Sequence, residues 1–315
     1  MKAKIALAFL AIYLIWGSTF LATRVAVRTI PPFFVSGTRF FLAGAVLFAI
    51  GRRQNREPLG WKNWGAATLM GALFFLVCHG GLSWAAQHVP SGISALLMAS
   101  VSMWTALFEW FRGSASRPGR LVMLSLLAGF GGIAALVIHP EGLAGSNVGS
   151  LGAAVVLIGA ISWAAGTVLT RGMPLTKSTV VNSGMQMMTG GGLLLLLGLL
   201  VGPVPRAAAL APPSVVAMLF LTLIGSLVGF TCYLWLLGVV SATRVATYAY
   251  VNPIVAVLLG WGLAGERLTM LSVAASFIVL AAVVIIVTSR QKVAPLGQRQ
   301  AEPAAYDVDQ VVARV

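Results

Sequence analysis

The sequence predicts an all-α integral membrane protein with ten transmembrane helices, arranged as two inverted five-helix repeats around a central cavity. Three observations predict this fold class: an apolar composition, a succession of long apolar stretches, and short sequence matches between the two halves. The 315 residues are 59% hydrophobic and only 9% charged. A soluble domain of this length is much more polar, so we expect the chain to lie in a lipid bilayer.

The apolar stretches give the positions of the helices. About 20 helical residues cross a hydrocarbon core about 30 Å thick, and short loops with Pro, Gly or Arg separate stretches of this length. We expect membrane-spanning helices at residues 4–23, 32–50, 63–86, 91–110, 119–138, 148–170, 179–201, 212–237, 242–262 and 268–288. The third and fourth are separated only by QHVPSG. The polar segment 291–315 is expected to be a disordered tail.

The distribution of basic residues predicts the orientation of the chain. The net charge of +14 is large enough for a nucleic-acid partner to be considered. When the loops are assigned alternately to two sides, however, the side of the N-terminus holds every lysine and most arginines. The other side holds only Arg24, Arg28, Arg206 and Arg267. This asymmetry follows the positive-inside rule, so we expect both termini in the cytoplasm and no nucleic-acid partner.

Two sequence matches indicate an internal duplication. WGSTFLATR at residues 16–24 aligns with WAAGTVLTR at 163–171, with Trp, Thr and Arg coinciding at an offset of 147 residues. The region from Trp84 aligns with that from Trp235 at an offset of 151, which pairs Ser102 with Pro253. Chance matches among Leu, Ala and Gly-rich helices are the alternative explanation.

The duplication predicts two units of five spans each, residues 1–140 and 146–290. Because five is odd, the second unit enters the membrane from the opposite side, and the repeats are inverted. Exchanging the conformations of two such halves opens a central site first to one side and then to the other. The sequence therefore predicts transport by alternating access.

Polar and aromatic side chains recur at helical spacing within several of the spans. Since the bilayer core contains no water, these side chains must face protein or a wet cavity. We expect them to form the substrate site. No Asp or Glu lies near the middle of any expected span. The candidate substrate-binding residues are Trp16, Thr19, His79, Trp84, Met98, Ser102, Trp163, Asn182, Gln186, Tyr250 and Asn252.

The stretch around Pro253 is unusual for a membrane span. Tyr250 and Asn252 precede Pro253, which removes a backbone donor and frees the carbonyl one turn earlier. Weakened backbone at membrane depth is tolerated where it lines a cavity. We therefore interpret Pro253 as a helix distortion in the cavity wall. The alternative is an ordinary kink, with Tyr248 in an interfacial aromatic belt.

Five titratable or charged residues each allow two interpretations, with Glu266 and Arg267 taken together. His79 is either a satisfied buried group or the best candidate for proton coupling, because its unperturbed pKa lies near physiological pH. Arg39, inside the second span, either snorkels or caps freed carbonyls, or it contacts an anionic substrate group. We interpret Glu109 as an interface anchor or ion-pair partner, and Glu266 with Arg267 as a local ion pair or cap.

Several of these segments resemble a known family. IYLIWGSTFLATRVAV, SGTRFFLAG, VPSGISALLMASVSMW, ISWAAGTVLTR and ATYAYVNPIVAVLLGWGLAGERLT are similar to the EamA-type branch of the drug/metabolite transporter superfamily. The resemblance covers about residues 5–288 and extends to the YddG-type exporters of aromatic amino acids. It implies a ten-helix secondary transporter with two EamA repeats. The family often has proline where this chain has Ser102, so the two halves are expected to bend unequally.

We expect an exporter of small metabolites, above all amino acids with aromatic or apolar side chains, in a bacterial inner membrane. The expected partners are this small-molecule substrate and the bilayer, with the chain as a monomer or weak homo-oligomer. Other amphipathic metabolites or drugs are the alternative. No GxxxxGK[ST], HExxH or GxSxG motif is present, which disfavours ATP-driven transport, an intramembrane enzyme and a metal site. A histidine-based enzyme (His79, His88, His139) and a channel remain minor alternatives, and no cofactor is expected.

Overall fold

The structure, a computed structural model, describes residues 2–55, 57–113, 119–138, 147–202, 204–206, 210–240, 242–266 and 269–293. Within these ranges all regular secondary structure is helical, and no strand is present. Seven helices or runs of helices are long and apolar enough to cross a membrane, and three shorter apolar helices lie at 120–135, 248–264 and 273–289. The protein is therefore a helical membrane protein, as predicted.

Each span expected from the sequence coincides with a helix or a run of helices. The first half consists of α1 (Lys2–Ala26), α2 (Pro32–Gln54), α3 (Trp61–Gly71), η1 (Ala72–His79), α4 (Gly80–Ala85), α5 (Ser91–Ala99), α6 (Val101–Phe111) and α7 (Arg120–Ile138). The second half consists of α8 (Asn147–Thr170), α9 (Thr179–Val201), α10 (Pro212–Leu219), η4 (Phe220–Val228), α11 (Gly229–Val239), α12 (Ala242–Val245), α13 (Tyr248–Ala264) and α14 (Met270–Val293). The helix α14 includes residues 291–293, where a disordered tail was expected, and the rest of that tail lies outside the described residues.

The third and eighth spans contain a π-helical segment that the sequence pattern did not predict. In η1 the N–H of Gly80 donates to the carbonyl of Phe75, and in η4 the N–H of Gly229 donates to that of Ile224. Both bonds join residues five apart instead of four, which widens the helix locally. Such segments are rare and often occur at functional sites, and here the two halves have one each at corresponding places.

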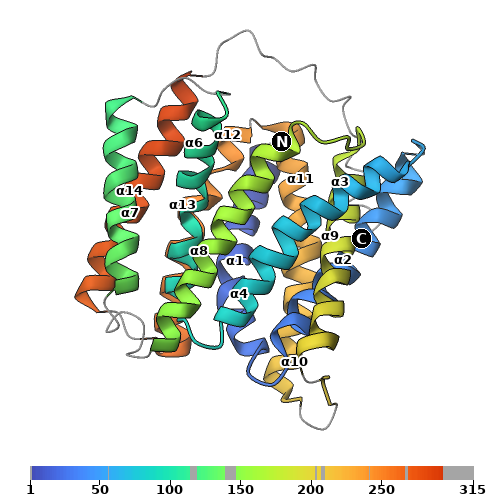
Figure 1. The fold of residues 1–315 in the computed structure, drawn as a ribbon, viewed down its shortest axis with the longest axis horizontal. Helices are drawn as coiled ribbons and strands as arrows, with labels where there is room; N and C mark the ends of the chain where they lie inside the picture. Colours follow the sequence, from blue (N-terminus) through green and yellow to red (C-terminus); the bar gives the residue numbers. More distant parts are fainter. Residues whose placement is uncertain are drawn as a thin grey trace.

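The helices pair across the two halves. The view in Figure 1 shows α7 beside α14 at one edge of the bundle, and α2 packs along α9 toward the other. The first helix of each half contacts the third and fourth spans of the other half: α1 packs on α10, η4, α11 and α13, and α8 packs on η1, α4, α5 and α6. In the same view α1 descends from the face where the chain begins, whereas α8 ascends toward it. We call that face the N-terminal face.

The contact between α2 and α9 is formed by glycines that recur every seven residues along each helix. We call this contact the glycine seam. A Cβ atom on Gly44 would lie 2.5 Å from the backbone nitrogen of Met188, and one on Gly191 would lie 2.5 Å from that of Phe41. These distances are shorter than side chains tolerate, so the helices approach this closely only because the residues are glycine. The two contacts correspond to each other: Gly191 follows Gly44 by 147 residues, and Met188 follows Phe41 by the same number. The seam glycines are Gly37, Gly44 and Gly51 of α2 and Gly184, Gly191 and Gly198 of α9.

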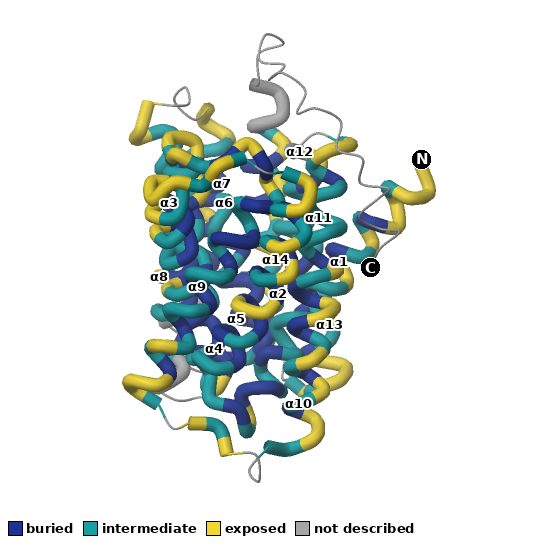
Figure 2. Tube along the Cα trace, turned by 90° about the vertical axis from the view of Figure 1, so that its right-hand side faces the viewer, coloured by how far each residue is buried: buried dark blue, intermediate teal, exposed yellow. Residues whose placement is uncertain are grey.

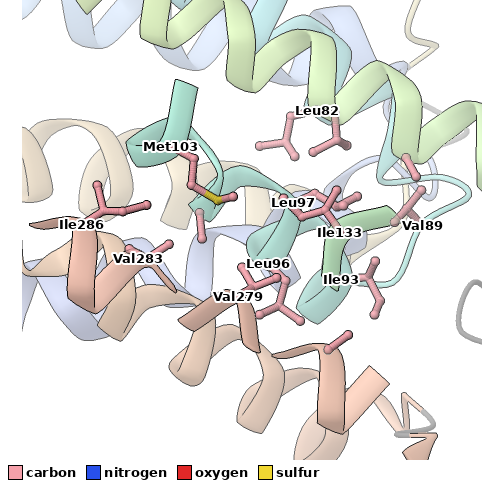
Figure 3. Packing of buried hydrophobic residues seen from close by; sticks show 14 of the residues in the cluster. Leu82, Val89, Ile93, Leu96, Leu97, Met103, Ile133, Val279, Val283 and Ile286 are labelled. Carbon is pink, nitrogen blue, oxygen red and sulfur yellow. The ribbon is translucent and has the colours of Figure 1, made fainter. Parts of the chain in front are cut away.

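The largest apolar core lies between α5, α7 and α14. Figure 3 shows Leu96 and Leu97 of α5 facing Ile133 of α7 and Val279 and Val283 of α14. All five side chains are buried. Burial of this surface holds the outer pair α7 and α14 against the rest of the bundle.

The outside of the bundle is also apolar. Exposed turns occupy the outer surfaces and both ends in Figure 2, and many of them carry large hydrophobic side chains. Leu127 is 68% exposed and Phe277 is 72% exposed. Such a surface is suited to lipid, which agrees with a membrane location.

Candidate functional site

An aromatic cluster surrounds His79 at the end of η1. The ring centroids of Phe40, Phe75 and Trp163 lie 4.6, 5.9 and 5.6 Å from that of His79. These rings come from α2, η1 and α8, so both halves of the chain contribute. The imidazole is stacked on Phe75 and meets Trp163 edge-on, which are favourable aromatic geometries. We call these four residues the His79 cluster.

A second aromatic cluster surrounds Trp16 of α1. Its ring centroid lies 5.6 Å from Phe230, 5.2 Å from Tyr233 and 5.0 Å from Tyr248. The indole N–H donates to the carbonyl of Gly225, at 3.2 Å. We call Trp16, Phe230, Tyr233 and Tyr248 the Trp16 cluster. It joins the first half to η4, α11 and α13 of the second half.

Arg39 lies between the two clusters. Its guanidinium carbon is 4.4 Å from the centroid of Phe40 in the His79 cluster, and its Nε donates to the hydroxyl of Ser226, at 3.1 Å. A Cβ atom on Gly225 would lie 3.8 Å from an Arg39 Nη and 3.1 Å from the methyl group of Thr19. The glycine in η4 thus lets α1 approach η4 beside this arginine.

Hydroxyl groups fasten η1 and α4 to α2 beside this arginine. Ser36 donates to the backbone carbonyl of His79 at 3.2 Å and shares a hydrogen bond with Ser83. Both serines are buried. The backbone of the π-helical segment is therefore anchored where His79 enters its cluster.

Several predicted site residues lie at the margin of the apolar core instead. Trp84, Met98 and Tyr250 pack against the core of α5, α7 and α14. Trp84 also contacts His88, with 5.3 Å between the ring centroids, and the sulfur of Met98 lies 4.0 Å from the Cys78 thiol. The structure thus separates these three residues from Trp16, His79 and Trp163, which lie in the two ring clusters.

Other predicted side chains make local contacts. The amide of Asn182 accepts from the backbone N–H and hydroxyl of Thr176 and donates to its carbonyl, with distances of 2.7–2.9 Å, so it holds the segment before α9. The hydroxyl of Thr19 donates to the carbonyl of Trp16 in its own helix. Gln186 lies on α9 where its backbone carbonyl faces Gly71 of α3.

The remaining predicted residues lie in α6 and α13. Ser102 is half-buried in the first turns of α6. Asn252 is 8% exposed, and its side-chain oxygen is buried without a hydrogen-bond partner among the described residues. The helix α13 continues through Pro253. The interruption of this span lies earlier, at the turn of residues 246–247 between α12 and α13.

An ion pair closes the end of the bundle opposite the N-terminal face. Glu266 accepts from Arg24 at 3.2 Å, from the backbone N–H and hydroxyl of Ser91 at 2.8 and 2.9 Å, and from the N–H of Gly92 at 3.2 Å. The first two amides of α5 are therefore capped by a carboxylate. Gly265, with φ 64°, ends α13 and turns the chain so that Glu266 reaches this position. Glu266 is thus a helix cap, one of the two roles expected for it, but the ion pair that it forms joins it to the distant Arg24 and is not local. Arg267 lies outside the described residues.

A second ion pair lies at the N-terminal face. Arg171 at the end of α8 pairs with Glu109 of α6, at 2.9 Å, so the interpretation of Glu109 as an ion-pair partner is confirmed. Arg171 follows Arg24 by 147 residues. The arginine is 69% exposed in this pair and 30% exposed in the pair at the opposite face, and the glutamates are 13% and 8% exposed. The pair at the opposite face is therefore the more buried of the two.

Sequence reasoning missed the aromatic residues Phe40, Phe75, Phe230 and Tyr233. Apolar rings in a membrane span give no signal that separates an interior position from a lipid-facing one. The described residues contain no group of three His, Cys, Asp or Glu suited to a metal ion, and His139 lies outside them. A polar and aromatic site between helices of both halves, inside an apolar bundle, is an arrangement typical of membrane transporters.

Comparison with known proteins agrees with this class. The EamA-like transporter family matches residues 3–138 and again residues 150–288. The chain therefore belongs to the EamA-like transporter family. A relative from Escherichia coli K12, named "Uncharacterized inner membrane transporter YedA", is 34% identical over 282 residues, which cover 89% of each chain.

Two further comparisons extend this result. Protein PecM of Dickeya dadantii is 27% identical over 90% of this chain and 94% of its own. This chain also superposes on a solved crystal structure with a TM-score of 0.61 and 19% sequence identity. The match covers 93% of this chain and 99% of the other chain, and it supports the fold alone. With its apolar helices and its likeness to an inner membrane transporter, the protein is a multi-pass membrane transporter of bacterial inner-membrane type.

Proposed function

We propose that this chain is a secondary active transporter that exports small amphipathic metabolites, in particular amino acids with aromatic or apolar side chains. The observation that carries the proposal is the pair of aromatic clusters joined by Arg39 within the membrane-spanning bundle. Ring faces bind apolar and aromatic groups by stacking, and a few polar groups fix orientation. This combination matches a molecule with one apolar end and one charged end.

Alternating access between two inverted repeats, residues 1–140 and 146–290, is part of the proposal. Three observations support it: the family matches the chain twice, α1 and α8 run in opposite directions, and the contacts of the glycine seam recur at the same offset of 147 residues. In inverted-repeat transporters the site lies between the repeats. Both clusters described above contain residues of both halves.

We propose further that the N-terminal face is cytoplasmic. The support is the excess of lysine and arginine in the loops on that side. The more buried ion pair, Arg24 with Glu266, then lies at the periplasmic end.

Drugs and lipophilic cations are the competing substrates. The only charged group within the two clusters and their direct contacts is the cation of Arg39, in the part of the chain that the structure describes. Cations are usually held by a carboxylate or by unoccupied ring faces, whereas here Arg39 itself covers Phe40. The site therefore favours anionic or zwitterionic substrates, in line with the YddG-type exporters that the sequence resembles.

The test is counterflow in liposomes. Vesicles preloaded with unlabelled amino acids are expected to accumulate labelled phenylalanine, tryptophan and methionine faster than glutamate. Trp163→Ala should abolish most of this uptake because it removes a wall of the His79 cluster. Trp261→Ala is the matched control, because Trp261 is 60% exposed on the outside of α13. Equal activity of both variants, or no counterflow by folded wild type, would refute the substrate assignment.

A further inference from the structure

Arg39 is a buried cation inside the bundle. It lies seven residues into α2, roughly 10 Å along the helix, and is only 5% exposed. In the described part of the chain both ion pairs are at helix ends, Arg24 with Glu266 and Arg171 with Glu109, and neither includes Arg39. A buried charge without a counter-charge is costly, so an anion that bound there would be strongly stabilised.

The donors of this arginine are only partly used. Of its N–H groups, Nε–H donates to Ser226. No hydrogen bond from an Nη atom is formed to a described residue, yet neither Nη is among the fully buried side-chain atoms without a partner, which are Ser94 Oγ, Trp104 Nε1 and Asn252 Oδ1. The Nη groups therefore keep unused donors on a side chain that is 5% exposed. A guanidinium offers its donors as a planar fork that matches a carboxylate.

The arginine is also held in place. Ser226 of η4 fixes Nε from one side, and Phe40 supports the guanidinium at 4.4 Å from the other. Because both contacts come from rigid helices, little side-chain entropy remains to be lost when an anion binds. This arrangement differs from snorkelling or capping of backbone carbonyls, one of the two interpretations that the sequence left open.

The side chains around Arg39 determine which substituent a bound anion can have. Phe40 links Arg39 to the His79 cluster, and Gly225 links it to the Trp16 cluster, since its carbonyl accepts the Trp16 indole N–H and its Cα faces an Arg39 Nη. An aromatic or branched side chain attached to the anion therefore meets ring faces on either side. A small hydrophilic anion would have no apolar group to place against these rings.

We propose that Arg39 binds the carboxylate of the transported molecule, so that the substrates are carboxylates with an apolar or aromatic substituent. The proposal rests on the transport function above and narrows it: the carboxylate is required, whereas an α-amino group is not. It also excludes amines that lack the acid. Ser226 acts as a positioning residue because it orients the guanidinium and does not contact the ligand.

The experiment uses the full chain in liposomes, with three competitors of labelled phenylalanine counterflow. Unlabelled phenylalanine and 3-phenylpropionate carry the carboxylate, whereas phenethylamine carries only the amine. We expect the two carboxylates to compete at similar concentrations and phenethylamine to need a concentration at least about tenfold higher, the usual effect of losing charge-assisted hydrogen bonds. Equal competition by phenethylamine, or none by 3-phenylpropionate, would overturn the proposal.

Variants test the residue itself. Arg39→Gln should weaken phenylalanine binding at least about tenfold, and Arg39→Lys should lie between it and the wild type because it keeps the charge but not the fork. Arg28→Gln, at an exposed arginine, should change nothing. Unchanged binding by folded Arg39→Gln would refute the role. If Arg39→Gln does not fold, the competitor series on the wild type still decides.

The two proposals fail in different ways. Transport of phenethylamine but of no carboxylate would leave the transporter intact and exclude an anion at Arg39. A folded wild type that moves none of the three molecules would overturn the proposed substrate class, and the role of Arg39 with it. Carboxylate transport that survives in Arg39→Gln would retain the substrate class and exclude this residue as its binding site.

Discussion

Replacement of Glu266 by alanine removes the carboxylate that joins α1, α5 and α13. Glu266 accepts four hydrogen bonds: one from Arg24, two from Ser91 and one from Gly92. Its side chain is 8% exposed. The substitution therefore leaves two amides at the start of α5 without their acceptor, and leaves Arg24 without its counter-charge.

The expected decrease in the free energy of unfolding is smaller than the summed contributions of these four hydrogen bonds. A hydrogen bond to a charged group contributes about 1.5–3 kcal/mol, but water can reach the end of a helix and replace part of this. A carboxylate at a helix N-terminus contributes up to about 2 kcal/mol in a partly buried setting, and a half-buried ion pair adds to it. We therefore expect Glu266→Ala to lower the free energy of unfolding by about 2–4 kcal/mol.

The matched control is Glu109→Ala at the N-terminal face. The Glu109 side chain is 13% exposed, but its partner Arg171 is 69% exposed, so water screens the pair from the arginine side. Ion pairs screened in this way contribute about 0–1 kcal/mol. In detergent, a thermal unfolding scan should show a midpoint about 3–6 °C lower for Glu266→Ala and a smaller change for Glu109→Ala. Gly260→Ala gives a second variant, because its Cβ would contact the Glu266 carboxylate and displace it. Equal shifts for Glu266→Ala and Glu109→Ala would refute the reasoning.

Three further predictions concern other parts of the molecule. Gly44→Val should greatly lower the yield of folded protein in size-exclusion chromatography, because its Cβ would lie 2.5 Å from backbone, whereas Gly131→Val should not, because nothing lies within 4 Å of that position. Asn182→Ala should lower the unfolding midpoint by a few degrees, for about 1–3 kcal/mol of lost hydrogen bonding, and leave phenylalanine affinity unchanged; a changed affinity would return Asn182 to the substrate site. His79→Asn should retain counterflow but lose any acceleration of uptake by an acidic vesicle lumen, since only the imidazole binds a proton as the pH falls; acceleration that persists would exclude His79 from proton coupling.

The positions of the helices could be read from the sequence because they depend on local composition. The expected span at 179–201 has the same bounds as α9, which begins after the Ser178 cap and ends before Gly202. The break at QHVPSG is the turn between α4 and α5. Length and hydropathy determine where a chain crosses a bilayer, and neither requires knowledge of its neighbours.

The composition of the site was less predictable, because it depends on contacts between distant segments. Asn182 and Trp163 looked alike as large polar or aromatic groups on helix faces. Asn182 lies in the first turn of α9, where an amide can fold back on Thr176, whereas Trp163 lies well inside α8 and meets His79. The isolated sequence of α2 likewise does not reveal that Ser226, 187 residues away, orients Arg39.

The glycine seam has a consequence for how the two halves can diverge. Gly44 meets the backbone at Met188, and its counterpart Gly191 meets the backbone at Phe41, so a bulkier residue in one half tilts α2 against α9 instead of moving them apart evenly. Only a matched change at both positions would keep their axes in the same relation. Substitution of one glycine by a larger residue is thus tolerated only together with a matching substitution of its counterpart in the other half. Along this line the offset of 147 residues between the two halves recurs in backbone contacts, at positions where glycine has no side chain to compare.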